Sequence, residues 1–211
     1  MNKTLSVNKI ILAIGAGLFT AFLLQACQPK YKAEASCGFI QNAYGERVAI
    51  HDLPLHLSLH SSYPEIYRPV FIIAMQEWET RLNRPLFILE DPRDEGPLDP
   101  RRDSKNVIYW MDTWEADKST EQARTSVYWE GDAIREADMR INAHDFTFYE
   151  ETPKGEKNEV HLKSLLIHEL GHVLGLAHRN DTASVMQPYL ADDTSRPQLA
   201  SIDVQSASCE Y

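Results

Sequence analysis

The sequence lacks several features that mark common functional classes. Its 211 residues contain no Gly-rich phosphate loop, no serine nucleophile elbow and no internal repeat. Only three cysteines are present, and 21 Lys and Arg are outnumbered by 31 Asp and Glu. The missing motifs give no support to a nucleotide-dependent enzyme, a serine hydrolase or a repeat protein, and the acidic balance argues against nucleic acid as a partner.

Charged residues are scarce at the amino end, where Lys3 and Lys9 are the only ones among residues 1–26. Positions 10–24 form an apolar run of fifteen residues, which is short for a membrane span and typical of a signal-peptide core. The run ends in L-Q-A-C at Cys27, a sequence that resembles a bacterial lipobox. This resemblance implies cleavage before Cys27 and acylation of its thiol. Ordinary secretion with a chance cysteine is the alternative.

The expected organisation is a lipoprotein signal peptide over 1–26, a polar tether over 27–36 and one domain over 37–211. The 185 residues after the signal peptide carry 19 basic and 31 acidic side chains, a net charge of −12. They are enough to bury a core. Gln28, which follows the lipobox cysteine in place of Asp, predicts an outer-membrane location if the cell has two membranes. We therefore expect a lipid-anchored protein of the bacterial envelope.

The other two cysteines, Cys37 and Cys209, lie near opposite ends of the domain. Domain termini are often close in space, and an exported chain folds in an oxidising compartment, so a disulfide is expected. A pair of free thiols is one alternative.

One stretch carries metal chemistry. Residues 168–178 read H-E-x-x-H-x-x-G-x-x-H. A helix would place His168 and His172 on one face, one turn apart, where both imidazoles can bind one Zn²⁺. Glu169 would lie beside the metal, as a general base for the water that the zinc activates.

The glycine of this stretch has a structural role. Gly175 can adopt positive φ and end the helix, so that the chain folds back and His178 becomes a third ligand. Three protein ligands and an open position are the catalytic pattern of zinc. An amphipathic core helix with incidental histidines is the alternative. The length of the motif favours the metal site.

The stretch resembles the long zinc signature of the metzincin metalloproteases, which have a methionine turn further along the chain. Residues 184–189, S-V-M-Q-P-Y, resemble that turn and are similar to the matrixin branch. The resemblance implies that Met186 lies beneath the metal ligands and that Pro188 and Tyr189 continue into the substrate pocket. Arg179 follows the third histidine, where matrixins commonly have serine. The resemblance also implies a second alternative for Cys37, a latency switch in which its thiol binds the metal.

The resemblance implies an α+β fold, a metzincin-like catalytic domain with a twisted, mostly parallel five-stranded sheet, one antiparallel edge strand and about three helices. Leucines alternate with polar residues over 55–59, which predicts a strand with His56 and His60 facing solvent. A helix should begin at Ser62 or nearer Tyr67 and end before 83–85.

Further strands are predicted over 86–89, 107–110, 127–129 and 137–141. The last of these alternates strictly and resembles the edge strand above the metzincin cleft, where an extended peptide can pair. The loop 91–103 contains five acids and three arginines, and metzincin loops often bind Ca²⁺. Its spacing fits no calcium motif, however, and the alternative to a calcium site is that the three arginines pair with the carboxylates.

These observations predict a monomeric zinc endopeptidase with one catalytic Zn²⁺ and Glu169 as general base, acting on protein or peptide substrates. The alternative from another class is a surface-anchored, zinc-containing binding or adhesion module without proteolysis.

Overall fold

The computed structural model of the protein describes residues 35–191 and 194–211. The expected signal peptide, Cys27 and all but the last two residues of the expected tether lie outside the described residues. In the described part of the chain, no helix is long and apolar enough to cross a membrane.

The elements follow one another along the chain with the helices and strands interleaved. They are β1 (Leu55–Leu59), the 3₁₀ helix η1 (Glu65–Tyr67), α2 (Arg68–Leu82), β2 (Phe87–Leu89), β3 (Val107–Met111), the 3₁₀ helix η2 (Ala116–Lys118), β4 (Ala123–Glu130), β5 (Ala133–Asn142), β6 (Thr147–Tyr149), β7 (Glu159–His161), α3 (Leu162–Val173) and α4 (Ser201–Ala207).

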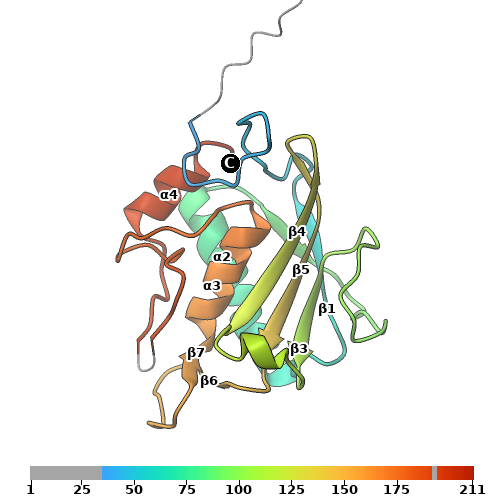
Figure 1. The fold of residues 1–211 in the computed structure, drawn as a ribbon, viewed down its shortest axis with the longest axis vertical. Coiled ribbons are helices and arrows are strands. Elements are labelled where there is room, and N and C mark those ends of the chain that lie inside the picture. The colour runs from blue at the N-terminus through green and yellow to red at the C-terminus, as the bar shows by residue number, and fades with distance from the viewer. Residues whose placement is uncertain (1–34, 192–193) are drawn as a thin grey trace, which may run out of the picture. The chain divides into compact units, whose positions relative to one another are not determined.

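The main sheet has five strands in the order β2-β1-β3-β5-β4 (Figure 1). All neighbouring pairs are parallel except β4 and β5, which form a hairpin. Gly131 turns this hairpin with a φ of 64°, in the left-handed region that a glycine adopts without strain. The predicted fold, a mostly parallel five-stranded sheet with one antiparallel edge strand and three helices, is confirmed.

The edge strand is not the one that the sequence indicates. β4 is the edge, and β5, which contains residues 137–141, lies between β3 and β4. The alternation of apolar and polar residues over 137–141 wrongly suggests a strand with one face in solvent, because one of its polar residues is a buried acid. Asp138 is only 1% exposed, so β5 is covered on both faces. A peptide that pairs with the edge of this sheet beside β5 would therefore pair with β4.

Helices α2 and α3 pack side by side on one face of the sheet (Figure 1). The Trp78 indole on α2 donates to Ile167 O on α3 at 3.0 Å, inside the core. α2 begins after Tyr67, as the position of Pro69 suggests, and ends at Asn83 in the left-handed conformation, with a φ of 52°. This packing fixes the helix that carries the histidine motif.

The prediction that His60 faces solvent is wrong. Its side chain is buried, with Nδ1 2.9 Å from Ser62 Oγ and Nε2 3.0 Å from Gly96 O. The loop after β2 covers this face of β1, because Ser61 N donates to Asp94 O at 2.9 Å. His56, in contrast, is exposed as expected.

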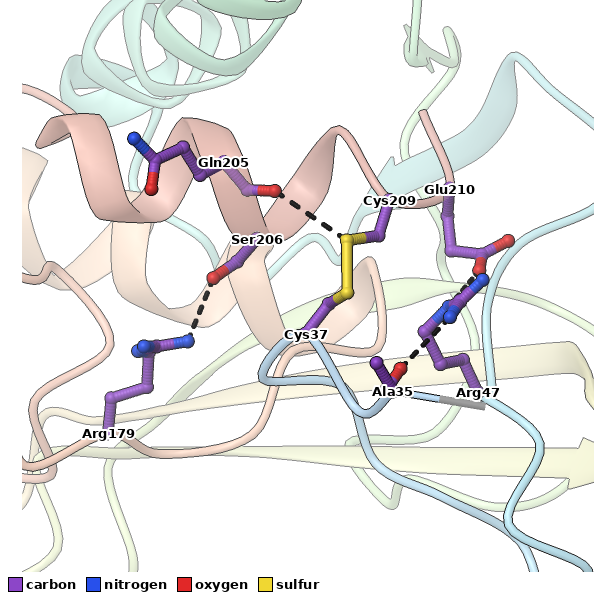
Figure 2. The surroundings of a disulfide bond; sticks show 8 residues. All are labelled: Ala35, Cys37, Arg47, Arg179, Gln205, Ser206, Cys209 and Glu210. Carbon is purple, nitrogen blue, oxygen red and sulfur yellow. Dashed lines mark hydrogen bonds and ion pairs between the residues drawn. A yellow bond between two sulfur atoms is a disulfide. The ribbon is translucent and has the colours of Figure 1, made fainter. Parts of the chain in front are cut away.

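A disulfide joins Cys37 to Cys209, as expected from their places in the chain (Figure 2). Beside it, the Arg47 guanidinium forms an ion pair with Glu210 and donates to Ala35 O at 2.9 Å. Because Cys37 is bonded to Cys209, it offers no thiolate to the histidine cluster, and the latency-switch alternative is not supported.

Candidate metal centre and cleft

Three imidazoles meet near the end of α3. His168 and His172 are one helical turn apart, and His178 lies on the loop that follows. The Nε2 atom of His172 is 3.0 Å from that of His168 and 3.1 Å from that of His178, and the remaining pair is 3.2 Å apart. Within residues 35–191 and 194–211, these three histidines are the only group of three or more potential ligands gathered in this way.

Gly175 turns the chain so that His178 can reach the cluster. Its φ is 96°, and a Cβ added there would lie 2.1 Å from Val48 O, so both the conformation and the close approach require glycine. The returning segment is held by residues 38–40, since Ala177 N donates to Gly38 O at 2.7 Å. The position of His178 therefore depends on backbone contacts across the domain.

The other ring nitrogens of the helical histidines are held by backbone carbonyls. His168 Nδ1 is 2.7 Å from Val185 O, and His172 Nδ1 is 2.7 Å from Leu176 O. A carbonyl can only accept, so each Nδ1 must carry its proton when the ring is neutral. Each Nε2 is then left with a free lone pair directed at the centre of the cluster, as a metal ligand requires.

Burial favours the neutral form of these rings. It lowers the pKa of His168 to about 4, and the charges of His178 and Arg196 also lower it. Burial likewise lowers the pKa of His172 to about 4, and that of His178 falls for the same reason. At neutral pH the cluster therefore presents neutral imidazoles, which are the form that binds metal.

Glu169 lies in the same cleft and is buried. Its Oε2 accepts a hydrogen bond of 2.6 Å from Thr125 Oγ1 on the edge strand β4. Burial raises the pKa of Glu169, while the electrostatic interaction with the neighbouring His172 and the Thr125 hydrogen bond act in the opposite direction. The local pattern around 168–178 gives no sign of Thr125, because 44 positions of the chain separate it from Glu169.

Met186 is buried against α3 at the level of the histidines. A Cβ added to Gly171, the residue before His172, would lie 2.3 Å from the Met186 sulfur. Met186 O accepts from Arg179 N at 2.9 Å, next to His178. Met186 thus fills the space beside the helix backbone between the first two histidines.

The segment that contains Met186 is fixed by α4. Asp203 is fully buried and accepts hydrogen bonds from Ser184 Oγ and, at 3.1 Å, from Val185 N. Val185 O in turn accepts from His168, so a chain of hydrogen bonds connects α4 to the histidine cluster. Asp203 is a supporting residue that no motif indicates.

A cleft of about 640 Å³ runs between α3, β4 and the segment that follows Met186. The three histidines and Glu169 line it, together with residues of β4, namely Ala123, Arg124, Thr125, Val127 and Trp129. Pro188 and Tyr189, predicted to reach the substrate pocket, line the cleft together with Arg196. Tyr189 is 53% exposed, so its ring is available to a ligand.

The acidic loop 91–103 forms contacts within itself and with residues on either side of it. Asp94 accepts from Lys105 Nζ at 2.8 Å and from Gly96 N at 3.0 Å, and Arg93 pairs with Glu65. These contacts do not address calcium, which stays a prediction for this loop.

The cluster fits a zinc ion. Two ligand atoms at the roughly 2.0–2.1 Å that zinc–imidazole bonds require lie about 3.3 Å apart around a tetrahedral ion. The three Nε2–Nε2 distances, 3.0 to 3.2 Å, are close to this value. Three converging nitrogens also leave one side of such an ion open toward the cleft, which is the arrangement of catalytic rather than structural zinc sites.

The sheet order, the three helices and this cluster define a metzincin-like domain of the zinc metallopeptidase class. Residues 99–211 match the matrixin family, a match that covers more than half of the sequence, and the chain belongs to that family. Family membership implies zinc and peptide substrates. Arg179, at the position where serine is common, does not place the chain outside the family. No curated protein matches the chain.

Proposed function

We propose that the protein is a zinc-dependent endopeptidase in which His168, His172 and His178 hold the metal and Glu169 is the general base. The observation that carries the proposal is the meeting of these four side chains in one cleft. The cleft is bordered by β4, an edge strand with an unpaired outer side among the described residues. A supporting observation is the Nδ1 hydrogen bonding, which leaves the Nε2 atoms of His168 and His172 free for a metal.

A zinc ion bound here would polarise the scissile carbonyl and lower the pKa of a coordinated water. Glu169 accepts a proton from the attacking water and delivers it to the departing amine nitrogen. The Thr125 hydroxyl on β4 orients the Glu169 carboxylate. Met186 packs against α3 at Gly171. Val185 O keeps His168 in the tautomer that is protonated on Nδ1, which leaves Nε2 free for the metal.

The substrate in this proposal is an extended peptide paired with the outer edge of β4. Ala123, Thr125, Val127 and Trp129 all line the cleft, and their spacing of two residues shows that they share one face of the strand. An edge strand offers unpaired N–H and C=O groups to such a peptide. Pairing at Thr125 brings a scissile bond next to Glu169.

The test is Glu169→Ala, compared with the wild type on a mixed peptide library with and without a chelator. The wild type should cleave, the chelator should abolish cleavage, and Glu169→Ala should retain zinc and lose hydrolysis. Full activity in Glu169→Ala would refute the mechanism. A wild type that retains zinc and cleaves nothing would instead favour the anchored binding module.

We also propose that the protein is anchored in the bacterial envelope by a lipid on Cys27. The proposal is supported by the apolar run and the L-Q-A-C sequence before the domain. Labelled fatty acid should be incorporated into the wild type and not into Cys27→Ser. Equal incorporation in both would disprove the lipobox assignment.

A further inference from the structure

The cleft contains one arginine that no carboxylate balances within the described part of the chain. Arg124 and Arg196 both line the cleft. Arg124 is neutralised by Glu121 and Glu115, to which its guanidinium donates. No described acidic side chain forms an ion pair with Arg196, so its charge is available to a ligand.

The Arg196 side chain lies across the wall of the cleft. Its Nη2 donates to Gln187 Oε1 and its Nη1 to Tyr189 O at 3.4 Å, and both acceptors are neutral. Its backbone N donates to Ser164 Oγ at 2.6 Å. Ser164 precedes His168 by four positions on α3, about 6 Å along the helix axis. The backbone of Arg196 is therefore anchored about one turn before His168, and its guanidinium lies on the part of the cleft wall formed by Gln187 and Tyr189.

The direction of β4 shows whether the residues before or after the scissile bond of a bound peptide lie beside the wall formed by Gln187, Tyr189 and Arg196. Gln122, just before β4, donates from Nε2 to Leu190 O at 2.7 Å, so the wall lies beside the beginning of the strand. Thr125, near the beginning of β4, contacts Glu169 and so shows where the proposed general base lies along the strand. Trp129 lies near the end of β4. Antiparallel pairing is the more common and slightly more stable arrangement. A peptide antiparallel to β4 has the residue that follows the scissile bond on the Arg196 side.

We propose that Arg196 selects substrates with an acidic side chain, Asp or Glu, at the residue that follows the scissile bond. The inference rests on the proposed endopeptidase function and names the substrate class for that same cleft. A guanidinium binds a carboxylate through two parallel hydrogen bonds. Gln187 and Tyr189 already hold the Arg196 side chain in place, so little side-chain entropy is lost when a substrate binds.

The first experiment digests a random peptide library with the full chain and identifies the products by mass spectrometry. Asp and Glu should be enriched after the cleaved bond, and Lys and Arg should be depleted. A library without any acidic enrichment at that position would overturn the inference, while chelator-sensitive cleavage in the same digest would leave the endopeptidase function standing.

The second experiment measures kcat/KM for two peptides that differ only by Glu or Gln after the scissile bond. The pair is nearly isosteric, so the ratio of the two values isolates the charge. The wild type should favour Glu by about tenfold or more, since a hydrogen bond between a guanidinium and a carboxylate is roughly twice as strong as one to a neutral amide. Because both values come from one enzyme preparation, a partly misfolded fraction cancels in the ratio.

The variants assign the preference to one side chain. Arg196→Met retains the length of the side chain and should bring the Glu/Gln ratio close to one, whereas Arg196→Lys should retain part of the preference. Arg135→Met is the matched control, because it removes the same charge from a half-exposed residue of β5 that does not line the cleft. It should leave the ratio unchanged.

The outcomes separate the two proposals. A wild-type ratio near one, or a preference for Glu that persists in Arg196→Met, overturns the role of Arg196. A wild type that cleaves no peptide in a chelator-sensitive way overturns the endopeptidase function, and the inference about Arg196 with it.

Discussion

The hydroxyl of Thr125 donates a hydrogen bond of 2.6 Å to Glu169 Oε2 and thereby joins the edge strand β4 to helix α3. Both residues line the cleft, and the bond lies where β4 and α3 meet beside the proposed general base. It sets the direction of the carboxylate, because the rest of that side chain is enclosed by the core.

Thr125→Val should therefore lower kcat by about tenfold or more, since a hydrogen bond to a charged group contributes roughly 1.5–3 kcal/mol. KM should change little, because the valine side chain has nearly the same shape and the peptide pairs with the backbone of β4. Thr125→Ser, which restores a hydroxyl, should recover most of kcat. Steady-state kinetics on one peptide checks both variants, and an unchanged kcat in Thr125→Val would refute the positioning role.

Gly171→Ala should destabilise the fold by about 1–3 kcal/mol, the usual cost of overpacking a core. The added methyl group would lie 2.3 Å from the Met186 sulfur and 3.1 Å from the Trp78 ring. Urea unfolding measures the loss. In a double-mutant cycle with Met186→Ala, the two changes should cost less together than the sum of the single changes, because the smaller side chain makes room. Strict additivity would show that the contact is not tight.

Met186→Leu, a change that nearly preserves volume, should retain bound zinc and keep activity within about tenfold, because such swaps usually cost under roughly 1.5 kcal/mol. Met186→Asp places a charge in a site that is 1% exposed and should abolish folding or zinc retention. Zinc content by atomic absorption, measured with circular dichroism, distinguishes the two failures. Normal zinc content and activity in Met186→Asp would contradict the buried placement.

Replacing both Cys37 and Cys209 by serine should reduce stability by about 5 kcal/mol according to the loop-entropy relation, because the bond closes a loop with a sequence separation of 172. The hydrogen bonds by which residues 38–40 hold the segment before His178 do not involve the sulfur atoms, so kcat at a temperature where the variant is folded should be largely retained. Thermal unfolding and kinetics on the same preparation check the two statements. A large loss of kcat at full folding would show that the disulfide shapes the cleft.

Asp138 makes stability depend on pH. Burial raises its pKa from 3.8 to about 7, although a hydrogen bond from Val107 N acts in the opposite direction. Between these two values the folded state holds a proton that the unfolded state has released. The stabilisation is complete below about pH 4, decreases as the pH rises, and is lost above about pH 7.

Urea unfolding at pH 5 and pH 8.5 should therefore show the wild type losing more stability between these pH values than Asp138→Asn does. Asparagine retains an oxygen to accept from Val107 and cannot ionise. Asp99→Asn changes the same group on the surface and serves as the control. Equal losses in the wild type and in Asp138→Asn would contradict the raised pKa.

The sequence predicted best what depends on local spacing. The four-residue step from His168 to His172 and the need for glycine at 175 are properties of a helix and its end, so the cluster could be inferred without knowledge of the fold. The strand over 55–59 was predicted for the same reason. The alternation of its leucines reports directly on the side of the strand that packs against the core.

What the sequence did not predict depends on contacts between distant segments. Thr125 contacts Glu169 across 44 positions of the chain, Arg196 contacts Ser164 across 32, and Asp203 contacts Ser184 and Val185 across 19 and 18. No local pattern marks these residues. The edge strand was assigned to β5 because an acid in the core, Asp138, reads as solvent-facing. The small parallel sheet of β6 and β7 was missed because each strand has only three residues and, unlike the equally short β2, is not a continuous apolar run.

The bond between Cys37 and Cys209 turns almost the whole domain into a covalent ring. A peptidase at high concentration meets its own surface loops as substrates. A single internal cut between these two cysteines would leave the two fragments attached to each other, so a self-nicked molecule would migrate as one band without reductant and as two with it. Because of this ring, one cut in the chain does not release a fragment from the domain.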